Sequence, residues 1–520
     1  MNLPIAGDSV RNPHAGVKVF SDYVGKVRDK CDVLVVGSGP GGAVVAKELA
    51  EAGRDVILLE EGPPFGAKDM RPDAPNESMR RTLREGGTRS TRGNLFMPTM
   101  QAIALGGGSL INSAISCRAP GWSLAKWAER YHLADFDAHS LDEHYAAVEK
   151  FLGIEHTPKE VLGERNRLFK KGCDALGWSS EPTPRNAPGC KGSAECFTGC
   201  RNGAKQSTDV SYVPAAIRHG ARVYTSVRAE TLLFDGKRVR GMRGRTIEPF
   251  TWREGDEVEI EAEHVVLAAG CMQTPVILLR SGVANSSGQV GENLQAHPGL
   301  AVMGIFDHVV DPWKGATQGY HSLQFLEEGM KMEVLWSPPG ILAVRLPGFG
   351  AELKDHLSRF DRMAPFDVFV QTKHSFGRVR PRRWGWDPDI RYDLDPRDVA
   401  LLQLGLVRIT ELTFAADAVG ALPGIYGVPE LLRSKDDIRF LRDRPLRAKD
   451  ATIAGTHVFG TARMGGNPRT SVTSSYGQCH DVPNLWVADT SLFPESSAVN
   501  PMLTCMALAR RVAHRIAQAS

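Results

Sequence analysis

A glycine-rich turn between an apolar strand and a helix is the feature that most constrains this chain. Residues 31–62 read CDVLVVGSGPGGAVVAKELAEAGRDVILLEEG, with one apolar run at 32–36 and a second at 56–59. An apolar run without alternation is typical of a strand buried on both faces, and the apolar residues between the two runs recur at helical spacing. The order strand, helix, strand predicts a βαβ unit, and therefore a parallel sheet, at the start of the fold.

The turn has the spacing GxGxxG, with its glycines at Gly37, Gly39 and Gly42. In such a turn the first glycine permits a tight bend, the second lets the backbone approach a pyrophosphate, and the third lets helix and strand pack closely. The start of the following helix offers free N–H groups to phosphates. Glu60 follows Gly42 by eighteen residues and ends the second strand, where a carboxylate can accept hydrogen bonds from an adenosine ribose. The pattern predicts a dinucleotide site without separating FAD from NAD.

The rest of the chain has a different character. Segments 222–234 and 257–269 are β-rich, and several short alternating segments lie within 300–400, among them KMEVLW and FDVFVQT. Strands at this spacing predict a second, mostly antiparallel sheet. A helix is predicted at the end of the chain, in PMLTCMALARRVAHRIAQA.

Length and charge narrow the class of protein. The 520 residues are enough for two to four domains and for a core large enough to enclose a cofactor. The formal net charge of +3, from 63 basic and 60 acidic residues, gives no reason to expect a nucleic-acid partner. We see no secretory signal and no apolar stretch of membrane-spanning length, so a cytoplasmic protein without a membrane span is expected.

Four further segments carry a resemblance to a known family. They are ALGGGSLIN (104–112), GCMQTPVILLRSGV (270–283), VGENLQAHP (290–298) and the C-terminal stretch GTHVFGTARMGG followed by NLWVADTSLFPESSAVNPMLTCMALARR. In this order they resemble the glucose–methanol–choline (GMC) oxidoreductases, nearest the branch of long-chain and aromatic alcohol oxidases and dehydrogenases. The resemblance implies FAD rather than NAD.

The resemblance also implies an α/β fold: an interrupted Rossmann-like FAD-binding domain and a substrate domain built on a mostly antiparallel sheet flanked by helices. We expect the FAD-binding domain to comprise residues 1–155, 205–299 and 446–520. The substrate-binding domain would comprise 300–445, and 156–204 would form a cysteine-bearing connecting segment.

The same resemblance assigns residues to the cofactor. Gly37, Gly39, Gly42 and Glu60 would hold the ADP half, and the backbone around Ala229 would contact the adenine. The remaining assignments, to the pyrophosphate, the ribityl chain and the flavin, are Gly107, Gly108, Asn112, Asp489, Asn500, Pro501 and Met502. Some relatives attach FAD through a histidine just before the position of Asn112; this chain has Ile111 there, so non-covalent FAD is expected.

His457 and Asn500 stand where the family keeps its catalytic pair. An alcohol gives up hydride readily only when its hydroxyl proton also leaves, and a histidine can accept that proton. An asparagine amide can hydrogen-bond to the same oxygen without adding charge, which would orient the carbon towards flavin N5. We expect His457 to be the general base and Asn500 to orient the hydroxyl. His297 matches another family position and is expected to be structural.

Three of the nine cysteines, Cys190, Cys196 and Cys200, lie close together with spacings of five and three intervening residues. This segment resembles the cysteine-bearing loop of the long-chain alcohol oxidase branch and, more loosely, that of bacterial FAD dehydrogenases with an iron–sulfur cluster. A packed loop or a disulfide, a metal centre, and a redox-active thiol pair all stay open. We predict no metal ligand among the site residues.

These observations predict an FAD-dependent alcohol dehydrogenase or oxidase, acting on an apolar or aromatic primary alcohol. Oxygen, a quinone or an electron-acceptor protein would reoxidise the flavin. The alternatives are a lyase of the hydroxynitrile type on the same fold, and a sugar or steroid alcohol dehydrogenase with an iron–sulfur centre.

Overall fold

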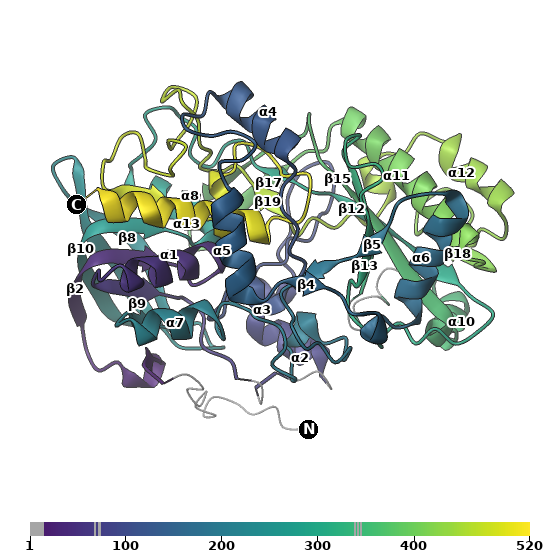
Figure 1. Ribbon diagram of the computed structural model, residues 1–520, viewed down its shortest axis with the longest axis horizontal. Helices are drawn as coiled ribbons and strands as arrows, with labels where there is room; N and C mark the ends of the chain where they lie inside the picture. The colour runs from purple at the N-terminus through teal and green to yellow at the C-terminus, as the bar shows by residue number, and fades with distance from the viewer. Residues whose placement is uncertain are drawn as a thin grey trace.

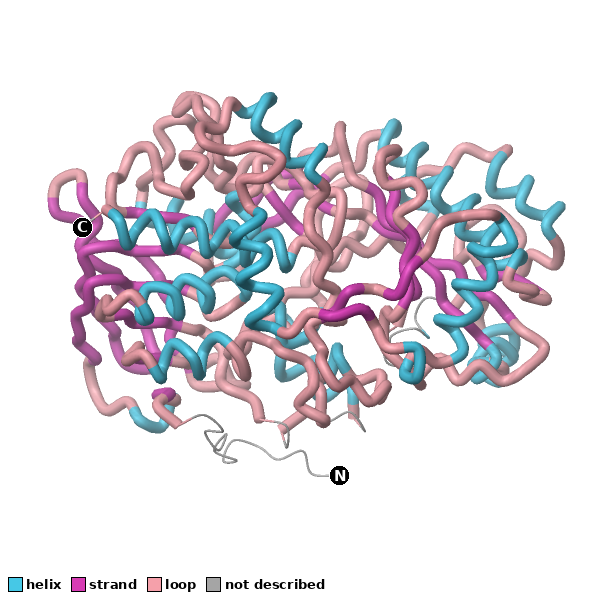
Figure 2. The backbone as a smooth tube through the Cα atoms, in the orientation of Figure 1, coloured by secondary structure: helices cyan, strands magenta, loops and turns pink. Residues whose placement is uncertain are grey.

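Two large sheets organise the chain. The computed structural model describes residues 15–66, 69–70, 74–336, 340, 343 and 346–519. Within these residues one sheet has eight strands and the other six, and they occupy opposite halves of an elongated molecule (Figure 1). Figure 2 shows the strands of the larger sheet gathered at the left and long loops running between the halves.

The larger sheet contains the predicted βαβ unit. Its strands, in spatial order, are β1 (Val17–Lys18), β7 (Arg222–Tyr224), β3 (Val56–Leu59), β2 (Val27–Val36), β10 (Glu254–Leu267), β9 (Arg238–Ile247) and β8 (Val227–Asp235), with β20 (Leu485–Val487) also beside β10. Pairing is parallel from β1 through to β10 and β20, and antiparallel among β10, β9 and β8. The strands within 27–59, 254–267 and 485–487 are far apart in sequence, yet they run side by side in one direction.

Helices cover the faces of this sheet. They are α1 (Pro40–Glu51), α5 (Asp142–Leu152), α7 (Tyr212–Arg218), α8 (Gly270–Ser281) and α13 (Met502–Gln518), with α4 (Gly121–Tyr131) above them. Helix α1 begins at Pro40, whose fixed φ and missing N–H suit the first helical position. Figure 1 shows α1 in purple beside α13 in yellow, so the first and last long helices pack together.

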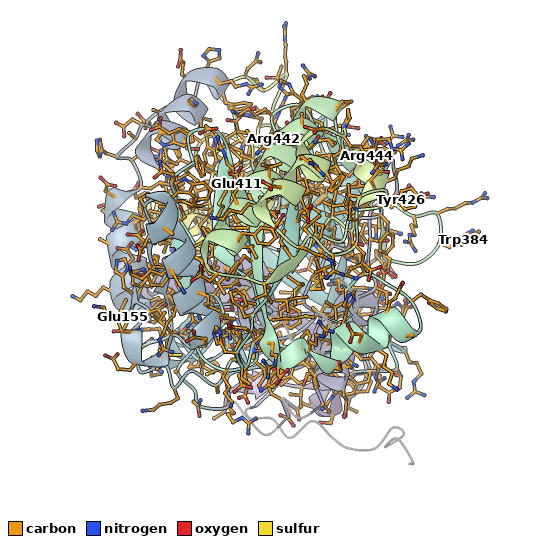
Figure 3. All side chains as sticks on the ribbon, turned by 90° about the vertical axis from the view of Figure 1, so that its right-hand side faces the viewer. Glu155, Trp384, Glu411, Tyr426, Arg442 and Arg444 are labelled. Atoms are coloured by element: carbon orange, nitrogen blue, oxygen red, sulfur yellow. The ribbon has the colours of Figure 1, made fainter. Side chains whose placement is uncertain are left out.

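The smaller sheet is antiparallel throughout. Its strands, in spatial order, are β18 (Gly420–Leu422), β12 (Gly299–Ile305), β15 (Met363–Val370), β14 (Met330–Val334), β13 (Tyr320–Ser322) and β5 (Glu181–Pro182). It packs against α6 (Glu164–Leu176) and α11 (Pro396–Ala415), and α10 (Ala351–Ser358) and α12 (Arg439–Arg442) lie further out. On this outer side Arg442 of α12 donates a 3.2 Å hydrogen bond to Glu411 of α11 (Figure 3).

Shorter elements connect the two halves. They are α2 (Pro75–Thr82), α3 (Gly108–Ile111), β4 (Glu155–His156), β6 (Pro184–Arg185), β11 (Gln295–Ala296), β16 (Gly377–Pro381), β17 (Pro388–Tyr392) and β19 (Val458–Phe459). The loop between β16 and β17 stands off the surface with Trp384 at its tip, 79% exposed (Figure 3).

The predicted fold class is confirmed: one mostly parallel sheet with helices on its faces, and a second antiparallel sheet flanked by helices. The domain boundaries stay a prediction. One strand of the expected connecting segment, β5, extends the edge of the smaller sheet. Among the helices of the described residues, none combines the length and hydropathy that a bilayer-spanning helix needs.

Close packing of α1 against β2 generates a test of the fold. A Cβ on Gly42 would lie 1.9 Å from the carbonyl oxygen of Gly37, a separation that no side-chain movement relieves. We expect Gly42→Ala to lower the free energy of unfolding of the cofactor-free protein by about 1–3 kcal/mol, the usual cost of overpacking. Thermal or denaturant unfolding measures this. Gly108→Ala is the matched control, because a Cβ there meets nothing within 4 Å; equal losses in both variants would contradict the packing argument.

Candidate active site

One cavity, of about 440 Å³, lies where the two halves meet. The carboxyl ends of the parallel strands contribute Val36, Leu59 and Glu60, and the smaller sheet contributes Glu333 and Phe369. In open α/β sheets this end of the strands is where ligands bind. Of the residues predicted from the sequence, those that line this cavity are Gly37, Gly39, Glu60, Gly107, Gly108, Asn112, Ala229, His457, Asp489, Asn500, Pro501 and Met502.

Gly42 is the one predicted cofactor residue outside the lining. A Cβ on Gly42 would lie 1.9 Å from the Gly37 carbonyl oxygen, so this glycine lets α1 pack against the end of β2, as the third glycine of such a turn does. Its assignment to the cofactor stays a prediction.

The two glycine turns touch each other beside the cavity. Gly37 has φ +102°, a backbone conformation that side chains rarely adopt, and a Cβ on it would lie 2.3 Å from the carbonyl oxygen of Ala268. A Cβ on Gly107 would lie 2.7 Å from the Cα of Gly39. Bare backbone therefore lines this part of the cavity at the N-terminus of α1. Such a surface fits the pyrophosphate of a dinucleotide, which needs N–H groups and close approach.

Glu60 ties the two turns together. Its Oε2 accepts hydrogen bonds from the Ser38 backbone N–H at 3.0 Å and from the Ser38 hydroxyl at 2.6 Å, and its Oε1 accepts one from the Gly62 N–H at 2.9 Å. The Ser38 oxygen in turn accepts from the Gly106 N–H at 2.9 Å. Burial raises the pKa of the Glu60 carboxyl, and these donors partly offset that cost.

Asp489 joins the C-terminal segment to α8. Its Oδ1 accepts from the Ser491 N–H at 2.7 Å, while Oδ2 accepts from the Gly270 N–H at 2.9 Å and the Thr274 hydroxyl at 2.6 Å. Burial raises the pKa of this carboxyl as well. Asp489 thus fixes the start of α8 against β20 at the cavity wall.

A buried lysine that the sequence reasoning missed supports the turn of Gly107 and Asn112. The Lys205 ammonium donates to three carbonyl oxygens, those of Leu110 at 2.5 Å, Asn112 at 3.1 Å and Cys196 at 2.6 Å. These include the carbonyls left open at the end of the short helix α3, so Lys205 caps it. Burial lowers the pKa of Lys205 to about 8. On the cavity side, Asn112 Nδ2 lies 2.9 Å from the Met502 sulfur.

His457 faces the cavity with its protonation pattern fixed by a neighbouring histidine. His297 Nε2 hydrogen-bonds to the carbonyl oxygen of Ser497, which can only accept, so His297 carries its proton there. Its Nδ1 is therefore an acceptor, and it lies 3.2 Å from His457 Nδ1. His457 must donate through Nδ1, which leaves Nε2 with a free lone pair.

The chemistry of His457 follows from this arrangement. Its Nε2 has no hydrogen-bond partner among the described residues, and the ring lines the cavity. Because the ring is otherwise enclosed, burial lowers its pKa to about 4, so it is neutral at physiological pH. His297, expected to be structural, thus holds His457 in one tautomer. The ring of Phe369 stacks on His297 with a centroid distance of 4.8 Å and meets His457 edge-on at 5.5 Å.

A second buried lysine, which the sequence patterns also did not predict, hydrogen-bonds to Asn500. Lys331 Nζ donates to Asn500 Oδ1 at 2.6 Å and to Glu333 Oε2 at 2.6 Å. Gln318 donates to the other carboxylate oxygen of Glu333 at 2.7 Å. The alternating segment KMEVLW put both residues on one face of a predicted strand, but nothing in that pattern indicated that this face meets the cavity.

Two of the cysteines share one arginine. Arg185 donates to the Cys196 sulfur at 3.0 Å, and its other terminal nitrogen lies 3.9 Å from the Cys190 sulfur. Burial alone would raise the pKa of the Cys196 thiol. Arg185 and Lys205 instead hold that pKa below its ordinary value. All nine cysteines lie in the described residues and none forms a disulfide. The packed loop, the metal centre and the redox thiol pair stay predictions.

Comparisons with known proteins match most of the chain. A family model described as GMC oxidoreductase matches residues 79–299, a second with the same description matches 374–509, and a model of an FAD binding domain matches 30–92. A long-chain-alcohol oxidase of Arabidopsis thaliana is 28% identical, over 97% of this chain and 70% of that protein. The crystal structure of pyridoxine 4-oxidase from Mesorbium loti has the same fold, with a TM-score of 0.68 at 18% identity over 94% of this chain and 100% of that one.

A GMC-type oxidoreductase of Mycobacterium tuberculosis is 34% identical over 93% of this chain and 75% of that protein. That identity extends across both halves of the molecule, and the two family models match an N-terminal and a C-terminal part of the chain. The chain therefore belongs to the GMC oxidoreductases and is an FAD-dependent oxidoreductase that acts on CH–OH donors.

Proposed function

We propose that the protein oxidises a primary alcohol to the aldehyde, with His457 as the general base and Asn500 as the group that orients the hydroxyl. The observation that carries this proposal is that one free hydrogen-bond acceptor and one free donor line the same cavity. His457 Nε2 offers a lone pair, and Asn500, with Oδ1 engaged by Lys331, has only its Nδ2 donors left. An alcohol hydroxyl needs one acceptor and one donor.

The cofactor assignments are part of the proposal. Gly37, Gly39 and Gly107 would let the pyrophosphate approach bare backbone at the N-terminus of α1. Glu60 and the backbone at Ala229 would hold the adenosine half, and Asn112, Asp489, Pro501 and Met502 the ribityl and flavin part. The buried aliphatic side chain of Ile111 offers no nucleophile, which supports non-covalent binding. When bound, FAD supplies the acceptor for the hydride.

The residues of this chain account for the proton and the geometry. The neutral His457 ring accepts the hydroxyl proton at Nε2 as the carbon gives up its hydride. Asn500 Nδ2 donates to the same oxygen, so the negative charge that develops there is met by a preorganised donor.

The proposed substrate is an alcohol with an apolar or aromatic body. Leu335, Trp336, Phe369 and Ile115 line the cavity near the catalytic pair, and Gln318 adds one polar wall. The similarity to a long-chain-alcohol oxidase supports the same class. The electrons would then pass from the flavin to oxygen, a quinone or an acceptor protein, and rates of turnover with and without oxygen distinguish these acceptors.

The first prediction concerns the reaction itself. Purified protein with bound FAD should lose its visible flavin absorbance when an apolar or aromatic primary alcohol is added without oxygen, because the hydride reduces the flavin. Stopped-flow absorbance with a panel of primary alcohols, sugars and sterols measures the rate for each class. Bleaching by sugars or sterols alone would contradict the substrate class. A bound flavin that no alcohol bleaches would count against alcohol oxidation and favour the lyase.

The second prediction concerns the base. His457→Gln should slow flavin reduction by about 10²–10⁴-fold, the usual contribution of a general base. In the unaltered enzyme the rate should stay constant through neutral pH and fall about tenfold per unit below pH 4, because burial lowers the His457 pKa to about 4 and only the neutral ring accepts a proton. Rapid mixing from neutral pH into acid buffers measures the profile. A break near the ordinary histidine pKa, or a profile unchanged in His457→Gln, would show that His457 is not the base.

The third prediction concerns His297. His297→Phe removes the acceptor of the His457 Nδ1 proton, so the base is no longer held in one tautomer; we expect flavin reduction to slow by about 10–100-fold. The matched control is His264→Phe, since the His264 ring is also partly buried and bonded, to Trp486 at 3.3 Å, but lies outside the cavity. Equal rates of flavin reduction in the two variants would show that His297 has only a structural role.

A further inference from the structure

A charged pair is buried at the cavity wall, in the middle of a sheet. Lys331 and Glu333 occupy alternate positions of β14, with side-chain exposures of 0% and 4%. Their neighbours on the strand, Met330, Met332 and Val334, are apolar. A buried ion pair adds little to stability, and apolar residues of similar size often replace one at no cost. Stability alone therefore gives a weak reason for this pair.

The Lys331 ammonium determines which way the Asn500 amide faces. An ammonium group only donates hydrogen bonds, so the atom of Asn500 that lies 2.6 Å from it must be the acceptor, Oδ1. The Nδ2 group is then the other end of the amide, and it has no hydrogen-bond partner within the described residues. Without Lys331 the amide would be free to rotate, and its oxygen would then present a second acceptor to the substrate where a donor is needed.

The Lys331 ammonium stays charged in its buried setting. Burial alone would lower the pKa of Lys331, but Glu333 above all raises it beyond its ordinary value, and Asp367, opposite Glu333 in β15, adds to that effect. Gln318 satisfies the second oxygen of Glu333. The Lys331 ammonium also lies 5.6 Å from the centre of the Phe369 ring, which packs against both His297 and His457.

We propose that Lys331 is a positioning residue for alcohol oxidation: with Glu333 as its counter-ion, it holds the Asn500 amide with Nδ2 towards the substrate oxygen and strengthens that donor. A cation on the amide oxygen draws electron density from the N–H groups, and the charge-assisted hydrogen bond is both shorter and stronger than a neutral one. The gain is largest when negative charge develops on the substrate oxygen, so Lys331 acts on the rate of reaction more than on binding. The inference rests on the proposed roles of Asn500 and His457.

The test uses the enzyme with bound FAD and a double-mutant cycle. The variant Lys331→Met/Glu333→Gln removes both charges together, so that no unpaired carboxylate is left in the core. It is compared with Asn500→Ala, with the combination of all three changes, and with the unaltered enzyme. Anaerobic stopped-flow over a range of alcohol concentrations yields the limiting rate of flavin reduction and the apparent Kd of the alcohol for each.

If Lys331 acts through Asn500, the charge-free pair should lower the limiting rate by about 10–100-fold and change the apparent Kd by less than about 3-fold, in line with the loss of a preorganised donor. In the Asn500→Ala background the same two changes should alter the rate by less than about 3-fold. An equal loss in both backgrounds, or a loss expressed only in Kd, would overturn the proposal, because a purely structural pair behaves in that way.

A second variant guards against misfolding. Lys331→Gln/Glu333→Gln keeps a neutral donor beside Asn500, and its rate should fall between those of the charge-free pair and the unaltered enzyme. If both double variants lose their flavin, the pair is a folding element and the proposal is overturned. An unaltered enzyme that no alcohol reduces would instead refute the proposed function itself, so the two failures are distinguishable.

Discussion

Close contact of bare backbone at the carboxyl ends of the parallel strands is the constraint on which this structure depends. A Cβ on Gly41 would lie 1.7 Å from the carbonyl oxygen of Ala488, as one on Gly37 would lie 2.3 Å from that of Ala268. The N-terminal turn, the end of β10 and the end of β20 can therefore meet only because glycine is present. Their meeting brings three distant parts of the chain to one edge, where bare backbone lines the cavity.

Two buried carboxylates connect the loops at this edge by hydrogen bonds. Glu60 accepts two hydrogen bonds from Ser38 in the first glycine turn and one from Gly62, and the Ser38 hydroxyl accepts one from Gly106 in the second turn. Asp489 accepts three that join α8 to the C-terminal segment. A buried carboxylate is costly unless hydrogen-bonded, so each acid also selects the one arrangement of loops that satisfies it. The positions of the cavity-lining side chains on those loops are therefore fixed as well.

Each of the two proposed catalytic side chains has neighbours that fix its hydrogen-bonding state. Ser497 and His297 determine the tautomer of His457, and Lys331 determines the face that Asn500 presents. Each effect starts from a group of fixed character: the Ser497 carbonyl, which only accepts, and the Lys331 ammonium, which only donates. The site thus offers one acceptor and one donor with little need to reorganise.

Much of this arrangement could be predicted from the sequence, because local patterns encode local geometry. The βαβ unit follows from two apolar runs around a glycine turn, and the antiparallel sheet from short alternating segments. The motifs around His457 and Asn500 name the two residues that the fold then brings to one cavity. Only the tertiary structure decided which residues hydrogen-bond to the site residues and fix their orientation. Lys331 lies 169 positions from Asn500 and Lys205 lies 93 from Asn112, and no local pattern couples such distances. His297 likewise takes its role from a histidine 160 positions away, because hydrogen-bonding state depends on the atoms in contact and not on the order of the chain.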